Sequence, residues 1–254
     1  MTATGRGGSG GSGGGRGSGS STGGRSLGGR TRVKTRRGRT NSSARWLERQ
    51  LNDPYVKRAQ MEGWRARAAF KLIELDERLG MLSGVDRVID LGAAPGSWSQ
   101  VVLKRRPKVK IVGIDLLEVE PLAGLTFIQG DFLAEGMDAQ LLALLGGAPD
   151  LVLSDMAANT VGHPQTDHFR TMALVEAAAD FAMRVLKPGG CFVAKVLGGG
   201  AEGALVAELK RHFETVRHAK PPSSRKESSE TFLVASGLKP RGTVAPAVID
   251  QPAD

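Results

Sequence analysis

The sequence predicts an α/β protein in which helices cover both faces of a mainly parallel, doubly wound sheet. Two observations support this prediction. Short apolar runs alternate along the chain with amphipathic stretches of helical length, which is the pattern of folds built from strand–helix–strand units. The earlier runs are almost continuously apolar, as expected for strands that crossover helices bury on both faces. The 254 residues suffice for one domain of ordinary size with additional segments.

Seven strands are expected, and the first five of them are the nearly continuous apolar runs. In chain order the expected strands span residues 87–91, 109–116, 125–129, 150–154, 191–197, 215–219 and 231–235. Amphipathic stretches predict helices at residues 64–79, 98–104, 138–145, 167–186 and 202–213. Gly80 is expected to end the first helix, and residues 187–190 are expected to end the fourth.

The two terminal segments differ in composition from the body of the chain. Residues 1–41 are mostly Gly, Ser, Thr and Arg, so no core can offset the entropy lost on ordering them. Residues 1–45 hold ten cations and no acid, which leaves 25 cations and 26 acids for the rest, so the net charge of +9 comes from this segment. We therefore expect a flexible basic arm at 1–41, a domain at 42–240 and a flexible tail at 241–254. The arm is either a solubilising linker or a segment attracted to phosphate backbones.

The composition also limits the class of protein. The single cysteine, Cys191, excludes an intramolecular disulfide and a zinc site made of several cysteines. No run approaches the roughly 18 apolar residues of a membrane span, and the N-terminal residues lack the apolar core of a signal peptide. We therefore expect a protein of the reducing cytoplasm, with no membrane partner and no metal site.

Residues 88–99 form the first candidate binding site, because an expected strand there runs into a small-residue turn and then a helix. Gly92 and Gly96 in such a turn allow a ligand to approach the backbone closely. The turn lacks the G-x-G-x-x-G spacing of dinucleotide sites, because Ala94 and Ser97 interrupt it. A ligand without a pyrophosphate is therefore favoured.

Acidic residues follow the next two expected strands. Asp115 lies at the end of the second strand, where a carboxylate could accept hydrogen bonds from both hydroxyls of a ribose. Asp131 follows the third strand, where a carboxylate could accept one from the amine of adenine. Each residue alone could instead be a turn former or a helix cap. Acids at successive strand ends, on the ligand-binding edge of such sheets, favour a nucleoside ligand without phosphate, and S-adenosylmethionine is such a molecule.

Two charged residues in apolar surroundings form a second candidate site. Asp155 ends the fourth expected strand, and Lys195 lies within the otherwise apolar fifth strand. A buried lysine needs a partner, and Asp155 is the natural candidate. The pair is either a structural ion pair or a catalytic one in which Lys195 acts as a general base. Lys71, in the first expected helix, is either a second lysine of this site or a solvated surface residue.

Six motifs, in order, resemble the FtsJ family of ribose 2'-O-methyltransferases over about residues 42–240. They are RARAAFKL at 65–72, DLGAAPGSWSQ at 90–100, QGDF at 129–132, SDMAAN at 154–159, VAKV at 193–196, and SSR at 223–225 with Glu230. Within the family, the resemblance is strongest to the bacterial enzymes of large-subunit ribosomal RNA. It implies the Rossmann-like fold of class I S-adenosylmethionine-dependent methyltransferases.

The resemblance also implies an activity and the residues that perform it. A Lys-Asp-Lys-Glu catalytic tetrad falls on Lys71, Asp155, Lys195 and Glu230. The implied cofactor contacts are Gly96, Trp98, Asp115, Asp131 and Asp155. The implied reaction transfers a methyl group from S-adenosylmethionine to the 2'-hydroxyl of a uridine in 23S ribosomal RNA, in the assembled large subunit, and we expect a monomer. Ala158 and residues 198–200 depart from the family's usual pattern, but neither departure removes a tetrad member.

Three alternatives remain at this point. The acceptor could be a transfer RNA or a messenger RNA cap, because the tetrad recognises ribose chemistry and not base sequence. The protein could bind RNA during ribosome assembly through a degenerate methyltransferase domain, although the intact tetrad argues against this. It could be an NAD-dependent oxidoreductase, which the interrupted glycine spacing disfavours. The candidate phosphate contacts, each of which could equally be a solvated charge, are Arg65, Arg67, Arg225 and Lys226.

Overall fold

The computed structural model describes residues 50–158, 162–198, 203–240 and 242, all of which belong to the second of two units of the chain, Arg49–Asp254. The expected arm and all but one residue of the expected tail lie outside the described residues.

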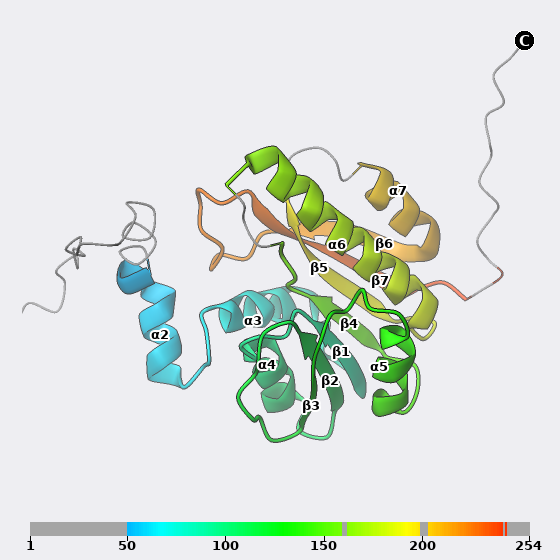
Figure 1. Ribbon diagram of the computed structural model, residues 1–254, viewed down its shortest axis with the longest axis horizontal. Helices are drawn as coiled ribbons and strands as arrows, with labels where there is room; N and C mark the ends of the chain where they lie inside the picture. Colours follow the sequence, from blue (N-terminus) through cyan, green and yellow to red (C-terminus); the bar gives the residue numbers. More distant parts are fainter. Residues whose placement is uncertain (1–49, 159–161, 199–202, 241, 243–254) are drawn as a thin grey trace, which may run out of the picture. The chain divides into compact units, whose positions relative to one another are not determined.

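Seven strands form one sheet in the order β3-β2-β1-β4-β5-β7-β6 (Figure 1). The strands are β1 Arg87–Leu91, β2 Lys110–Asp115, β3 Leu125–Gln129, β4 Leu151–Ser154, β5 Cys191–Leu197, β6 Phe213–Ala219 and β7 Glu230–Leu238. The first five strands run parallel, and β7 pairs antiparallel with β5 and β6. The predicted fold class is therefore confirmed.

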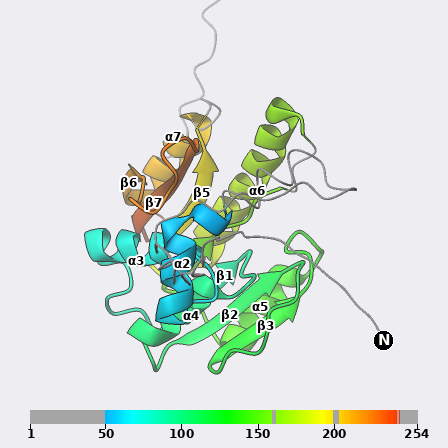
Figure 2. The ribbon, with the colours of Figure 1, turned by 90° about the vertical axis from the view of Figure 1, so that its left-hand side faces the viewer.

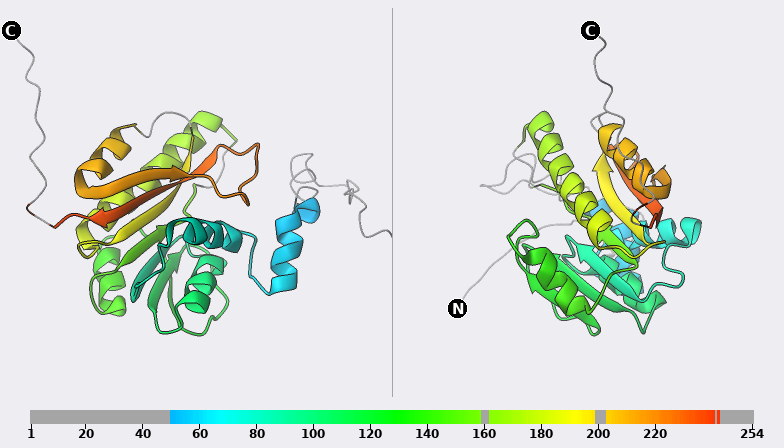
Figure 3. Two further views of the ribbon diagram at one scale, coloured as in Figure 1. Left: turned by 180° about the vertical axis from the view of Figure 1, so that it is seen from behind. Right: turned by 90° about the vertical axis from the view of Figure 1, so that its right-hand side faces the viewer.

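Helices cover both faces of the sheet, and each face has its own core. The described helices are α2 Pro54–Glu62, α3 Ala68–Leu79, α4 Ser97–Arg105, α5 Met137–Leu145, α6 Pro164–Val185 and α7 Gly203–His212. Helices α5, α6 and α7 share one core, which contains Phe181 and Leu209. Helices α3 and α4 share the other, which contains Leu72 and Trp98. Helix α6 passes in front of β5 and β7 in Figure 1 and behind them in the left view of Figure 3.

Helix α2 lies in a stretch for which the sequence predicts no element. Asp53 caps the helix by accepting a hydrogen bond from the Tyr55 N–H at 3.0 Å, and Gly63, with φ of 73°, ends it. The helix is only nine residues long and polar overall, and only Ala59 among them is buried, so little in the sequence marks it as part of the core. The helix predicted from residue 64 begins instead at Ala68. Figure 2 looks onto the side of the molecule on which α2 lies.

Three of the seven strands have the bounds that the sequence predicts. The bounds of β1, β3 and β5 are those predicted, whereas β7 is longer at both ends than the expected 231–235. The prediction that the first five strands are buried on both faces is wrong for β3, in which Thr126 and Gln129 are exposed. The reason is position, because β3 lies at the edge of the sheet with β2 as its strand neighbour.

Candidate active site

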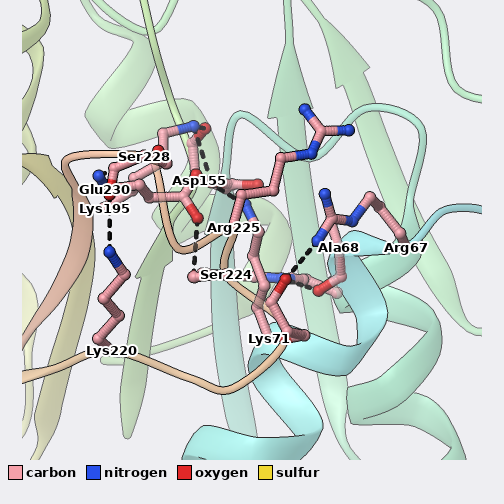
Figure 4. A network of polar contacts seen from close by, with 12 residues as sticks. Arg67, Ala68, Lys71, Asp155, Lys195, Lys220, Ser224, Arg225, Ser228 and Glu230 are labelled. Atoms are coloured by element: carbon pink, nitrogen blue, oxygen red, sulfur yellow. Dashed lines mark hydrogen bonds and ion pairs between the residues drawn. The ribbon is translucent and has the colours of Figure 1, made fainter. Parts of the chain in front are cut away.

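Four side chains from different parts of the fold meet as two ion pairs near the carboxyl ends of β4 and β5 (Figure 4). Lys195 Nζ lies 2.8 Å from Asp155 Oδ1 and also donates to the Asp155 backbone carbonyl at 2.6 Å. Lys71 Nζ donates to Glu230 Oε2 at 2.8 Å. The four side chains are only 11–21% exposed, so they are shielded from water but still reachable. The expected contact between Lys195 and Asp155 is therefore present.

The sheet itself sets the positions of three of these residues. Lys195 lies opposite Phe232 in the antiparallel β5–β7 ladder, and Glu230 comes two residues before Phe232. Side chains that are opposite or two residues along share a face, so Lys195 and Glu230 are diagonal neighbours, on the order of 7–8 Å apart. Asp155 directly follows β4, whose last residue pairs with Ala194 on β5. Asp155 therefore reaches Lys195 from the neighbouring parallel strand.

Helix α3 brings Lys71 to the same face of the sheet. Leu72 beside it is fully buried in the core under α3, and the Lys71 ammonium lies 5.6 Å from the centre of the Phe232 ring. The start of α3 is tied to α4, because Trp98 Nε1 donates to the Ala68 carbonyl at 2.9 Å. Lys71 is therefore a half-buried site residue and not a solvated surface charge.

A cavity of about 560 Å³ opens beside Asp155, between the carboxyl ends of β1 to β4 and helix α6. Three of the predicted site residues, Asp115, Asp131 and Asp155, line it. Most of the other lining side chains are apolar, including Ile114 and Met156. This size and mixture of groups are typical of sites for small ligands.

The two acids on the far side of this cavity are held by backbone amides. The Asp115 carboxylate accepts hydrogen bonds from the N–H groups of Ala94 and Leu117, both at 2.9 Å and one to each oxygen. Asp131 Oδ1 accepts one from the Leu133 N–H at 2.9 Å. Both acids therefore form turns, which was the alternative interpretation. A carboxylate has about four acceptor positions, so Asp115 keeps one on each oxygen for a pair of ribose hydroxyls. The free acceptor positions of the Asp115 and Asp131 carboxylates therefore fit the ribose hydroxyls and the adenine amine of S-adenosylmethionine.

Gly96 and Trp98 do not line the cavity. The Trp98 side chain is 2% exposed and lies in the core, with its ring centre 5.7 Å from that of Phe232. A contact between Trp98 and the cofactor would therefore have to come from its backbone. Gly92 has a clearer role than the sequence indicated, because a Cβ there would lie 2.9 Å from the backbone nitrogen of Met156. Glycine at this position lets the ends of β1 and β4 meet at the cavity wall.

Asp90 is a buried acid for which the sequence suggested no role, although an aspartate within an apolar strand was a visible signal. Its side chain is fully buried, and Oδ2 accepts a hydrogen bond from the Ser99 hydroxyl at 2.7 Å. Oδ1 has no hydrogen-bond partner among the described residues. Burial, opposed by the Ser99 hydrogen bond and aided by the negative charges of Asp155 and Asp115, raises the pKa of Asp90 to about 7.

The four cations that the sequence marks as candidate phosphate contacts differ in the partners they have within the protein. The Arg65 guanidinium donates to three backbone carbonyls in the loops after β1 and β2, at 2.7–3.0 Å, so it holds those loops together. Arg67 and Arg225 both pair with Asp53. Lys226 is exposed.

A second cavity, of about 550 Å³, contains none of the predicted site residues. It is lined by residues of α5, the end of α6 and the end of β7. Of its three cations, Arg184 and Lys187 are paired with Asp138 and Asp150 at 3.0 and 2.8 Å, and Lys239 donates to two backbone carbonyls. Size therefore does not distinguish the two cavities, but the chemistry of their walls does.

Comparison with known proteins settles the family. Residues 64–238, more than half of the chain, match the model of the FtsJ-like methyltransferases. The chain belongs to the FtsJ-like methyltransferase family. Methyltransferases of this family use S-adenosylmethionine as methyl donor, so the cavity beside Asp155 is its candidate site. The matches do not favour the alternative of an oxidoreductase.

Two curated relatives and one solved structure resemble this chain over most of its length. A protein named ribosomal RNA large subunit methyltransferase E from Novosphingobium aromaticivorans is 64% identical over 200 residues, which are 79% of this chain and 90% of the relative. The protein of the same name from Zymomonas mobilis is 63% identical over 198 residues, which are 78% of this chain and 90% of the relative. The crystal structure of a ribosomal RNA methyltransferase from Plasmodium falciparum is 32% identical, with a TM-score of 0.63 over 70% of this chain and 100% of that chain.

Proposed function

We propose that the protein transfers a methyl group from S-adenosylmethionine to the 2'-hydroxyl of a uridine in 23S ribosomal RNA, within the assembled large subunit. The observation that carries this proposal is the pair of lysine–carboxylate contacts beside a cavity whose acids can accept ribose hydroxyls. The names of the curated relatives support the acceptor. A 2'-hydroxyl acceptor requires RNA, because DNA lacks that group.

Lys195 takes the proton of the acceptor in this proposal. When bound, S-adenosylmethionine supplies a methyl group that its sulfonium sulfur has already activated. The protein then needs to position the acceptor oxygen and remove its proton. Asp155 makes two contacts with Lys195 Nζ, at 2.8 and 2.6 Å, which orient that nitrogen. These two contacts leave a third position on the nitrogen, which is the one that receives the proton of the ribose hydroxyl in this proposal.

Lys71 and Glu230 form the other wall of the proposed acceptor site. Their ion pair lies on the same face of the sheet as Lys195, and Glu230 Oε1 also accepts a hydrogen bond from the Ser224 hydroxyl at 3.0 Å. A polar wall held from two sides can fix the orientation of a ribose, which supplies much of the acceleration when the donor is already activated.

The proposed acceptor can be tested by mapping 2'-O-methylated nucleotides in total RNA from cells with and without the protein. We expect one uridine of the large-subunit RNA to lose its methyl group, and the purified protein to restore it on large subunits isolated from the deficient cells. Loss of methylation in a transfer RNA or at a messenger RNA cap, with ribosomal RNA unchanged, would contradict the proposal.

We further propose the organisation and the setting in which the protein works. The proposed segments are an arm at 1–41, a methyltransferase domain at 42–240 and a tail at 241–254, and the proposed assembly is a cytoplasmic monomer. No helix within the described ranges is long and apolar enough to cross a membrane. Sedimentation analysis of the full chain tests the monomer, because a concentration-independent mass of 26.8 kDa is expected.

A further inference from the structure

Asp53 is a buried acid that lies outside the range matched to the family model and outside the tetrad. Its side chain is 6% exposed. Oδ1 caps α2 by accepting the Tyr55 N–H. Oδ2 pairs with two arginines, since it lies 2.7 Å from Arg67 Nη1 and 3.0 Å from Arg225 Nη2. One carboxylate therefore joins three separate segments of the chain.

Both arginines belong to segments that carry the Lys71–Glu230 pair. Arg67 is the residue before α3, one helical turn ahead of Lys71, and it also donates to the backbone carbonyl of Ser223. Arg225 follows Ser224, whose hydroxyl donates to Glu230 Oε1. Figure 4 shows Lys71 and Arg225 between Glu230 on the left and Arg67 on the right. Asp53 is therefore linked to Lys71 through Arg67 and the first turn of α3, and to Glu230 through Arg225 and the adjoining Ser224.

The Asp53 carboxylate offsets one of the two guanidinium charges at this junction. The Arg67 side chain is 15% exposed, and burial lowers its pKa, with Arg225 adding to the lowering and Asp53 opposing it. Without the carboxylate, two guanidinium groups would face each other in a partly buried space. Their repulsion would move the start of α3 away from the loop before β7.

We propose that Asp53 is a positioning residue for the tetrad, acting through Arg67 and Arg225 to set the geometry of the Lys71–Glu230 pair. The role rests on the proposed function, because it concerns the wall of the same acceptor site. The N-cap of α2, although not the rest of the helix, then helps to position the tetrad, and it lies before residue 64, where the match to the family model begins.

The first test is Asp53→Asn in the full-length protein, because asparagine keeps the oxygen that caps α2 and removes the charge. We expect kcat for methylation of unmodified large subunits to fall about tenfold or more, as misplacement of catalytic groups commonly causes. The KM for subunits and the dissociation constant of S-adenosylmethionine should stay within about twofold, because Asp53 touches neither Lys195 nor the cavity. The matched control is Glu62→Gln, which removes an exposed ion pair with Arg58 on the same helix and should leave all three values unchanged.

A second variant and a spectroscopic readout separate positioning from folding. Arg225→Gln leaves the cap of α2 intact and should reproduce the fall in kcat if Asp53→Asn does not fold. In protein labelled with ¹³C-lysine, the Lys71 side-chain signal, assigned with Lys71→Arg, should shift in Asp53→Asn and not in Glu62→Gln. An unshifted Lys71 signal would overturn the proposal whatever RNA is the acceptor. An unchanged kcat per folded molecule, or a change confined to KM, would also overturn it. If the unaltered protein does not methylate ribosomal RNA, that result refutes only the proposed function.

Discussion

The two halves of the carboxyl edge of the sheet hold their acids in different ways. After β2 and β3, Asp115 and Asp131 accept hydrogen bonds from backbone N–H groups. After β4 and on β7, Asp155 and Glu230 are each paired with a lysine at 2.8 Å. We refer to these as the cofactor half and the transfer half of the edge.

The difference indicates a division of labour. Backbone amides fix a carboxylate without neutralising it with a second side chain, so the cofactor half presents acceptors that suit hydroxyl groups. A lysine–carboxylate pair presents a nitrogen that can gain or lose a proton, so the transfer half suits acid–base chemistry. Changes in one half should therefore affect binding, and changes in the other should affect turnover.

The largest expected effect comes from the transfer half. Lys195→Ala should lower kcat by roughly 10²- to 10⁴-fold, the usual contribution of a general base, and leave S-adenosylmethionine affinity within a few fold. A tritiated-methyl assay and calorimetry measure the two quantities. Lys110→Ala, at the exposed first residue of β2, is the control and should change neither. Near-normal turnover of Lys195→Ala would refute its role as base.

The next effect comes from the cofactor half. Asp115→Ala should weaken S-adenosylmethionine binding by roughly 1.5–3 kcal/mol for each charge-assisted hydrogen bond that is removed. Asp115→Asn keeps one acceptor oxygen and should fall between Asp115→Ala and the unaltered protein. Isothermal calorimetry gives the three dissociation constants. Equal constants would show that Asp115 only forms the turn with Ala94 and Leu117.

The buried Asp90, within strand β1, leads us to expect that the stability of the protein depends on pH. Its folded-state pKa of about 7 exceeds the usual 3.8, so the folded protein holds the proton more tightly than the unfolded chain. Its contribution is therefore fully present below about pH 4 and is lost as the pH rises to about 7, by up to roughly 1.4 kcal/mol per pH unit. Asp90→Asn should remove this slope. Urea unfolding of both proteins between pH 5 and 8 measures it, and parallel stability curves would contradict the prediction.

The smallest effect is expected from a segment outside both halves. Deleting residues 1–40 removes nine cations. If they neutralise RNA phosphates, the slope of log affinity against log salt should flatten by about 0.7 for each single-strand phosphate that the shortened protein no longer neutralises. Turnover at saturating RNA and cofactor affinity should persist, because the tetrad begins at Lys71. Equal slopes for the full-length and shortened proteins would identify the arm as a linker.

The sequence predicted those features that leave a local signal. Lys195 stood out because a charge in an apolar strand demands a partner, and β1, β3 and β5 were found with their observed bounds because their apolar runs have clear ends. Helix α2 was missed because it is short and polar overall, with Ala59 as its one buried residue. The pairing of Asp53 with Arg225 could not be predicted either, since 172 positions separate them and only the folded chain brings them together.

Strand β7 is synthesised after β6 but lies between β5 and β6 in the sheet. Until residues 230–238 have been made, one edge of β5 is unpaired. Strand β6 is then unpaired as well, because among the described strands it pairs with β7 alone. Strands β1 to β4, which border the cavity, are all made earlier and pair with one another. Because a chain is synthesised from its N-terminus, every strand of the cofactor half is available before β7. The transfer half has to wait for the last strand of the sheet, which brings Glu230.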